Sequence, residues 1–467
     1  MVGPVASPLT HDAVIVVPGI MGSELVETAT GRVLWGLSDP RWYAEAWTTG
    51  ATLTALQLTE DERAGRLGRI AATQLLRAPA FAPVLRGTEP YNGLLTSLGH
   101  AVAHPDALLQ FPYDWRLSVA HNAGLLADAA EAHLTRWRQH PQGNRDAQLV
   151  LVAHSMGGLM ARYFTGVLGD GGAVRMTVTL GTPFLGSVKA AYILSTGWGT
   201  PILLPRHHLR TMARTLPGLY DLLPWYRCVD EGDTARALVP ADVASLGADV
   251  ELAEEAQRRH AALATVDSSR LRTVAGMEQP TMQSLLFRNG VAREKYYTCE
   301  DDGAGGLNRV DRHGDSIVYA GSATVAGVTA RPVSQSHNSL ANSADAIAYV
   351  LAVLADQPPA PPATATPPAH ATGIELPDVV AVNAAFDITL VNTDDPAEAS
   401  CRIIDISRDA TGAPLPPPVF LRRDGAVTAT VRLPRPGVYR VEAQCGDLPA
   451  VTQLVMAADA DDLADRA

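Results

Sequence analysis

The chain has 467 residues, of which 47 % are hydrophobic and 18 % charged, as in ordinary globular proteins of one or two domains. A net charge of -12 repels phosphate backbones, so nucleic acid is excluded as an expected partner. No apolar stretch approaches the roughly 20 residues of a membrane span, and the first residues lack the basic region of a signal peptide, so we expect a cytoplasmic protein.

The four cysteines are too few for a disulfide framework in a chain of this length. Cys401 and Cys445 both lie near the C-terminal end, where they either pair or remain free thiols. Cys228 and Cys299 have no spacing typical of a metal site, and no P-loop, dinucleotide or zinc motif is present. We therefore expect neither a metal nor a cofactor.

Strand-like and helix-like segments alternate along residues 1–356. The expected strands are Val14–Pro18, Leu149–Ala153, Met176–Leu180, Leu271–Ala275 and Tyr296–Cys299. The expected helices are Gly93–Leu98, Leu125–Gln139, Gly157–Leu168 and Ser339–Leu354. This alternation predicts an α/β fold with a mostly parallel sheet.

Four further segments define the rest of the predicted organisation. Residues 34–83 and 186–279 interrupt the alternation, and we interpret them as a lid and a cap over the sheet. Residues 357–373 are rich in proline and predict an extended linker. Residues 374–460 alternate with period two and predict a small all-β, immunoglobulin-like sandwich, which is either structural or a binding module.

The stretch "LVLVAHSMGGLMARYF" places Ser155 between a buried strand and a helix. A sharp strand-to-helix turn lifts the serine Oγ clear of the sheet, and small neighbours such as Ala153 and Gly157 avoid collisions there. The amide of Met156 then lies at the helix start, where unpaired donors favour negative charge. Ser155 is the candidate nucleophile, with alanine in place of the first glycine of G-x-S-x-G.

A nucleophilic serine of this kind is followed along the chain by an acid and then by a histidine. His337 lies in a loop just before the last helix of the domain, whereas His370 falls in the proline-rich linker. We therefore take His337 as the base. Asp315, directly after a glycine and before an apolar run, is the favoured acid, with Asp311 and Asp302 as alternatives.

Two further stretches have candidate roles near Ser155. "VIVVPGIMGSEL" is an early strand followed by a glycine-containing loop, and the amide of Ile20, or else of Met21, is the candidate second oxyanion donor. "FPYDWRLS" offers Tyr113, Trp115 and an Asp–Arg pair, which form either a structural ion pair beneath the cap or a direct substrate contact.

These stretches, with "TLGTPFLGS", "LYDLLP" and "GDSIV", resemble the lecithin–cholesterol acyltransferase and lysosomal phospholipase family of α/β-hydrolases, over roughly the first 350 residues. The resemblance implies an α/β-hydrolase fold, a triad of Ser155, Asp315 and His337, and an oxyanion hole from the Ile20 and Met156 amides. It also implies a mobile lid near residues 35–59. The candidate substrate or lid residues are Met21, Trp42, Trp47, Tyr113, Trp115, Thr182 and Pro183.

The function implied is a serine-dependent hydrolase or O-acyltransferase acting on lipid esters, with transient lipid-surface contact through the lid. The usual G-D-G-T-V of the family reads G-D-S-I-V here, and the family core leaves the C-terminal sandwich unaccounted for. Two alternatives remain: a carboxylesterase for small non-lipid esters, and a non-catalytic binding protein that keeps the hydrolase fold.

Overall fold

The computed structural model describes most of the chain between residues 8 and 458. The residues in that range that it does not describe are 37, 39–41, 43, 44, 47, 48, 77–90, 170, 200–203, 289, 290, 304, 305, 358–371, 378, 392, 394, 406–413, 424, 447 and 449. None of the described helices combines the length and apolarity that crossing a membrane requires.

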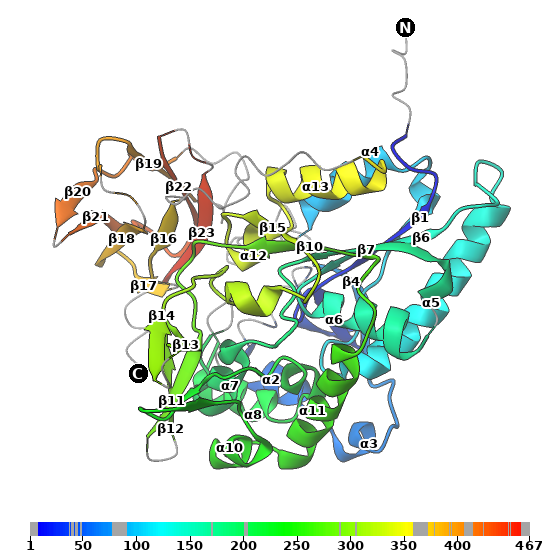
Figure 1. The fold of residues 1–467 in the computed structure, drawn as a ribbon, viewed down its shortest axis with the longest axis horizontal. Helices are drawn as coiled ribbons and strands as arrows, with labels where there is room; N and C mark the ends of the chain where they lie inside the picture. Colours follow the sequence, from blue (N-terminus) through cyan, green and yellow to red (C-terminus); the bar gives the residue numbers. More distant parts are fainter. Residues whose placement is uncertain are drawn as a thin grey trace, which may run out of the picture.

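A six-stranded parallel sheet forms the centre of the N-terminal part, in the order β15-β10-β7-β6-β1-β5 (Figure 1). The strands are β1 (Ala13–Val17), β5 (Leu108–Gln110), β6 (Leu149–His154), β7 (Val174–Leu180), β10 (Leu271–Gly276) and β15 (Ala330–Val333). Every residue of β1 and β6 is buried, because helices cover both faces of the sheet. The predicted parallel α/β fold is confirmed.

Helices α4 (Asn92–Ala101) and α13 (Ala344–Leu354) pack together on one face of this sheet, while α5 (Val119–Gln139) and α6 (Met156–Arg162) cover the other (Figure 1). The expected helix Ser339–Leu354 is wrong at its start. It is divided into α12 (His337–Leu340) and α13, because the Ser343 side chain accepts a hydrogen bond from Ala346 N (3.2 Å) and begins a new helix.

Three inserted segments lie between successive strands of the central sheet: between β1 and β5, between β7 and β10, and between β10 and β15. The first carries β2 (Ser23–Glu27), β3 (Val33–Trp35), α2 (Ala51–Ala55), α3 (Glu60–Arg63) and β4 (Ile70–Leu75). The second carries α7 (Val188–Thr196), α8 (Arg206–Ala213), α9 (Pro217–Tyr220), β8 (Val229–Asp230), β9 (Ala235–Arg236), α10 (Pro240–Ser245) and α11 (Val250–Ala264). The third carries β11 (Ser284–Arg288), β12 (Val291–Lys295), β13 (Thr298–Asp301) and β14 (Leu307–Val310).

Two boundaries drawn from the sequence are corrected by these insertions. The expected cap, residues 186–279, takes in β10, which is a strand of the central sheet. The expected strand Tyr296–Cys299 overlaps β13 at Thr298 and Cys299, but β13 pairs with β14 in a small sheet outside the central one. A short apolar run has the same pattern in a strand of the central sheet as in a strand of an inserted segment, so the sequence pattern does not distinguish these two kinds of strand.

The C-terminal part forms two four-stranded sheets around a core of its own. One sheet orders β16 (Gly373–Glu375), β18 (Ala385–Val391), β21 (Ala426–Arg432) and β20 (Leu421–Arg423), and the other orders β17 (Val379–Ala381), β23 (Val451–Ala458), β22 (Gly437–Cys445) and β19 (Ala399–Asp405). The expected antiparallel pairing holds except that β17 runs parallel to β23. The likeness of this C-terminal part to an immunoglobulin domain stays a prediction. Most of the expected linker, residues 357–373, lies outside the described residues.

All four cysteines are free, including Cys401 and Cys445. These two lie on the paired strands β19 and β22, but Cys401 stands opposite Ala443 and Cys445 opposite Ala399. Such diagonal neighbours have Cα atoms roughly 7–8 Å apart, which is beyond the reach of a disulfide. The pairing considered from the sequence is therefore absent.

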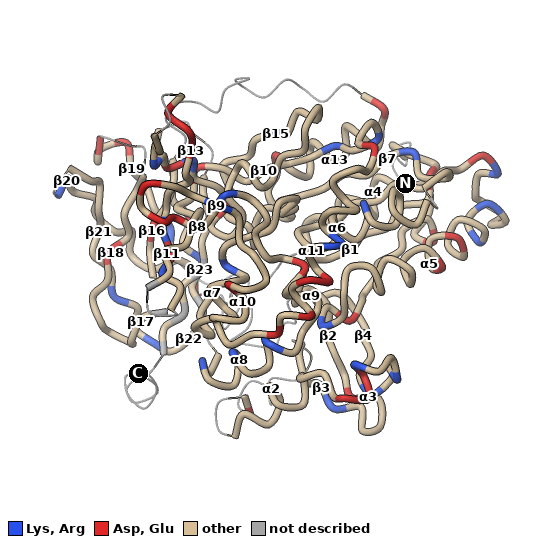
Figure 2. Tube along the Cα trace, turned by 60° about the horizontal axis from the view of Figure 1, so that its bottom comes forward, with Lys and Arg blue, Asp and Glu red and all other residues tan. Residues whose placement is uncertain are grey.

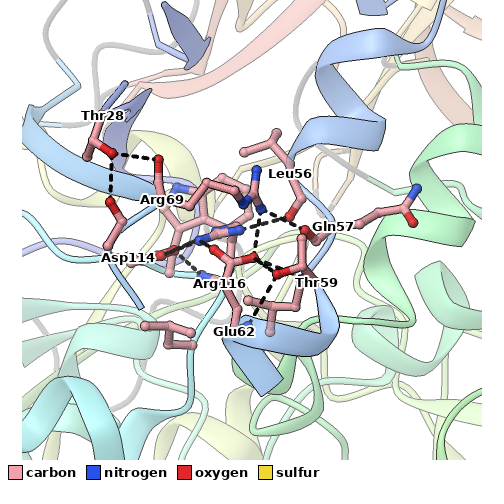
Figure 3. A network of polar contacts seen from close by, with 12 residues as sticks. Thr28, Leu56, Gln57, Thr59, Glu62, Arg69, Asp114 and Arg116 are labelled. Carbon is pink, nitrogen blue, oxygen red and sulfur yellow. Dashed lines mark hydrogen bonds and ion pairs between the residues drawn. The ribbon is translucent and has the colours of Figure 1, made fainter. Parts of the chain in front are cut away.

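A buried ion-pair network ties the lid segment (residues 34–83) to the central domain (Figure 3). The Arg116 guanidinium, only 1 % exposed, donates to Glu62 Oε1 at 2.9 Å and to Asp114 Oδ2 at 2.7 Å. Arg69 donates to Glu62 Oε2 at 2.7 Å. Figure 2 shows both signs of charge gathered around α3, which carries Glu62. The Asp–Arg pair of "PYDWR" is thus a structural anchor for the lid.

Burial acts to raise the pKa of Glu62, but hydrogen bonds from Arg116, Arg69 and the Thr59 amide outweigh it and lower the pKa to about 2. The ordinary value is 4.5. The ionised carboxylate is therefore stabilised in the folded protein. That contribution is fully present above about pH 4.5 and is lost as the pH falls toward 2.

Replacing Glu62 with Gln is expected to lower the free energy of unfolding by about 3 kcal/mol at neutral pH, because Arg116 loses a buried carboxylate partner. In urea unfolding, the gap between wild type and Glu62→Gln narrows between pH 4.5 and 2. The matched control, Glu60→Gln on the exposed side of α3, unfolds like the wild type. A gap that stays constant over this pH range, or an equal loss in the control, would contradict the assignment.

Candidate active site

Ser155 occupies a strained turn between the central strand β6 and helix α6. Its φ of 52° and ψ of -125° lie in a region that costs a non-glycine residue strain energy. Two hydrogen bonds hold the turn: Ser155 N donates to Leu180 O at 2.9 Å, and Thr182 Oγ1 donates to Ser155 O at 3.0 Å. The side chain of Ser155 thereby lies at the edge of the sheet, at the wall of a cavity.

Glycines at two positions let the backbone approach this turn closely. A Cβ on Gly157 would lie 2.4 Å from the carbonyl oxygen of Pro18, and one on Gly19 would lie 2.8 Å from the Cβ of Ser155. Neither gap admits a side chain. Gly19 after β1 and Gly157 after Ser155 are therefore both required by the close contact between these two loops.

The structure brings Ser155, His337 and Asp315 into one hydrogen-bonded line. His337 Nε2 lies 2.9 Å from Ser155 Oγ, and His337 Nδ1 lies 2.7 Å from Asp315 Oδ2. All three are buried, with exposed fractions of 5 %, 5 % and 0 % in that order. Asp315 Oδ1 also accepts from Ile317 N (3.0 Å) and Val318 N (2.7 Å), which fixes the carboxylate plane.

Asp315 is held at the end of β10, although the third insertion separates the two in sequence. Gln279, just after β10, donates its backbone N–H to Gly314 O at 2.8 Å. The alternative acids have other partners: Asp311 Oδ1 accepts from Gln283 Nε2 (2.6 Å), and Asp302 Oδ1 accepts from Gly306 N (2.8 Å). The strand that presents this candidate acid is therefore β10.

The loop after β1 lies beside Ser155. Gly22 N donates to Gly19 O at 3.1 Å to close a turn, and Met21 has a positive φ of 61°. Ile20 and Met21 line the same cavity as Ser155. Met156 is the first residue of α6, where backbone amides have no carbonyl in a preceding turn. Both proposed donors thus lie next to the candidate nucleophile.

A chain of hydrogen bonds joins this loop to His337 through Tyr91 and His154. Gly19 N donates to Tyr91 Oη (2.8 Å), Tyr91 Oη lies 3.0 Å from His154 Nδ1, and His154 Nε2 lies 3.2 Å from His337 O. Burial, aided by the nearby His337, lowers the pKa of His154 to about 3, so its ring is neutral. The pattern fits a tyrosine O–H donating to Nδ1 and a protonated Nε2 donating to the carbonyl.

Tyr91 was not found from the sequence. In "TEPYNGLL" nothing distinguishes this tyrosine from an ordinary residue at a helix start. Its partners Gly19 and His154 are distant in sequence, so only the fold brings the three together.

The cavity above Ser155 and His337 is lined mainly by apolar side chains. The residues from the lid, cap and central loops are Ile20, Met21, Trp35, Trp42, Leu76, Pro183, Ala190, Ile193, Leu219, Leu222, Ile317 and Val318. Trp35 and Trp42 pack with ring centroids 4.9 Å apart. An apolar, mostly enclosed lining of this kind suits a hydrocarbon chain.

The expected substrate and lid residues divide into three groups. Met21, Trp42 and Pro183 line the cavity. Thr182, Tyr113 and Trp115 do not line the cavity. Tyr113 Oη donates a hydrogen bond to Pro18 O (3.0 Å), and Trp115 Nε1 donates one to Ser23 O (3.1 Å). These two side chains therefore hold the loop after β1 in place. Trp47 lies outside the described residues.

His104, Asp106 and His140 have side-chain ligand atoms within 4.8 Å of one another, close enough to share a metal ion. His140 is the C-cap of α5, and His104 caps the short helical turn Pro105–Ala107. None of the three lines the cavity at Ser155, so this cluster has no part in the site.

Comparisons with solved structures and with protein families found the following similarities. A chain of the Tle4-Tli4 complex is 17 % identical, covering 73 % of this chain and 97 % of that one with a TM-score of 0.47. The Bacillus licheniformis lipase BlEst2 in its propeptide form is 14 % identical, covering 97 % and 75 %, with a TM-score of 0.33. A comparison with curated protein sequences found no match.

The model of the lecithin:cholesterol acyltransferase family matches residues 82–294. This range spans β5 to β12 and so includes "PYDWR", Ser155 and the cap helices α7 to α11. Over residues 82–294 the chain is therefore similar to the lecithin:cholesterol acyltransferase family.

Proposed function

We propose that the protein is a serine-dependent hydrolase or O-acyltransferase that acts on lipid esters. The observation that carries the proposal is the buried contact of His337 with Ser155 Oγ at 2.9 Å and Asp315 at 2.7 Å, beneath an apolar cavity. The similarity of residues 82–294 to the lecithin:cholesterol acyltransferase family supports ester chemistry at the coarser level. We also propose that residues 1–356 form the catalytic domain and that 374–460 form an accessory β domain.

The contact geometry suits nucleophilic catalysis through an acyl-enzyme. His337 Nε2 takes the proton from Ser155 Oγ as the oxygen attacks the ester carbonyl. The carbonyl oxygen gains negative charge, and the amides of Ile20 and Met156 donate hydrogen bonds to it. As the tetrahedral intermediate collapses, His337 returns the proton to the leaving alcohol, and Asp315 holds the ring in the required tautomer.

The acyl group then rests on Ser155 until water or an alcohol attacks. His337 takes the proton of the acceptor, and collapse of the second intermediate returns it to Ser155. The apolar side chains over Ser155 would hold the hydrocarbon chain, because removing its surface from water is favourable. Trp35 and Trp42 belong to the lid segment and are buried against the cavity, and we propose that this segment also meets a lipid surface.

Replacing Ser155 or His337 with Ala is expected to lower kcat on a p-nitrophenyl ester on the order of 10⁴-fold each, because either change removes the unit that activates the nucleophile. Asp315→Asn should cause a loss of similar order, since the ring of His337 then adopts the wrong tautomer. Asp311→Asn is the matched control and should retain nearly full activity. A larger loss in Asp311→Asn than in Asp315→Asn would overturn the assignment of the acid.

The preference for lipid esters is tested with a series of esters of one alcohol and increasingly long acids. Each methylene buried in the cavity contributes about 0.8 kcal/mol, so kcat/KM should rise roughly fourfold per methylene until the cavity is filled. Initial rates on soluble esters give the slope, and phospholipid vesicles extend it to an assembled substrate. Highest activity on acetate esters, with none on vesicles, would identify a small-ester carboxylesterase instead.

A further inference from the structure

A second cavity lies against the active site, between the catalytic part and the C-terminal sheets. It has a volume of about 300 Å³, whereas a single water needs only about 10–15 Å³. Three residues, Lys189, Ile317 and Asn338, line both this cavity and the one above Ser155. The two cavities are therefore neighbours that share a wall, which includes Asn338, the residue after His337.

The C-terminal sheets form the outer wall of this second cavity, through β16 and β23. Hydrogen bonds hold that wall against the loop that carries His337. Gln335 Oε1 accepts from Thr452 N at 3.1 Å, and Ser336 Oγ donates to Thr452 O at 2.6 Å. Both Gln335 and Ser336 are buried. The wall is thus fixed in place by bonds to the two residues that precede the histidine.

The lining of the second cavity is polar, unlike that of the first. Hydroxyl and amide groups come from Ser316, Asn338, Ser339 and Gln453, and Lys189 and Glu375 add one charge of each sign. Glu375 and Gln453 belong to the C-terminal sheets, on β16 and β23. Donors and acceptors are mixed, and the formal charges of Lys189 and Glu375 cancel. A group with several hydroxyls, each of which both donates and accepts, matches such a lining.

We propose that this second cavity is the subsite for the alcohol part of the substrate, and that it takes a neutral polyol such as glycerol. The inference rests on the proposed function. In ester cleavage His337 delivers a proton to the leaving alcohol, so that alcohol must lie on the histidine side of Ser155. Asn338 directly follows His337 and lines both cavities. The acyl chain enters the apolar cavity while the alcohol enters the polar one.

The proposal gives the C-terminal domain a place in substrate selection. The catalytic domain supplies the triad and the apolar cavity, and β16 and β23 supply Glu375 and Gln453 to the polar one. A hydrolase core without these sheets would leave that side open to solvent. Substitutions on the C-terminal sheets are therefore expected to change the selectivity for the alcohol, although the substituted residues lie outside the triad.

The test compares a short-chain glycerol ester with the methyl ester of the same acid, both at concentrations at which they stay monomeric. The readout is the ratio of their kcat/KM values, which cancels changes common to both substrates. Wild type should favour the glycerol ester. Gln453→Trp fills the polar cavity and should lower the ratio on the order of tenfold, equivalent to losing one or two hydrogen bonds. Glu375→Ala, at an exposed position, should lower it in the same direction with little risk to folding.

The matched control is Gln444→Trp, the same substitution on the neighbouring strand β22, outside the cavity. It should keep the wild-type ratio. Equal values for the two esters in wild type, or an equal fall of the ratio in Gln444→Trp, would overturn the subsite while leaving the hydrolase assignment intact. Failure of the wild type to cleave either ester would instead overturn the proposed function, and the subsite with it.

Discussion

The strained backbone of Ser155 is the constraint on which the rest of the site depends. A residue with φ of 52° between a strand and a helix persists only where its surroundings over-determine it. Here the carbonyl of Leu180 and the hydroxyl of Thr182 hold the turn, and Gly19 and Gly157 leave room for it. The strain aims Oγ at His337 before any substrate arrives. In such a site catalysis needs little rearrangement.

Burial of the polar groups around this turn is possible because each has a partner. Asp315 accepts from two backbone amides as well as from His337, and the neutral His154 lies between Tyr91 and the His337 carbonyl. These contacts connect the loop after β1, the nucleophile turn and the histidine loop into one network. A displacement of any one of these loops would therefore change the hydrogen bonds of the other two.

Much of the candidate site could be proposed from the sequence because the patterns around it are local. The five apolar residues before Ser155, the glycines after it and the proline-glycine of the early loop all reflect steric needs of one turn. What the sequence did not reveal depends on distant contacts: Tyr91 with His154, β10 with the loop that carries Asp315, and "PYDWR" with Glu62 of the lid segment. The register that separates Cys401 from Cys445 is likewise set only by strand pairing.

The central claim is that Ser155 is a nucleophile activated by its buried contacts. The most direct measurement is mass spectrometry of the full chain after exposure to a fluorophosphonate, with the adduct located by peptide mapping. We expect a single adduct on Ser155 in the wild type and none on that peptide in Ser155→Ala, with labelling strongly slowed in His337→Ala. An unlabelled wild type, or equal labelling of Ser155→Ala, would contradict it.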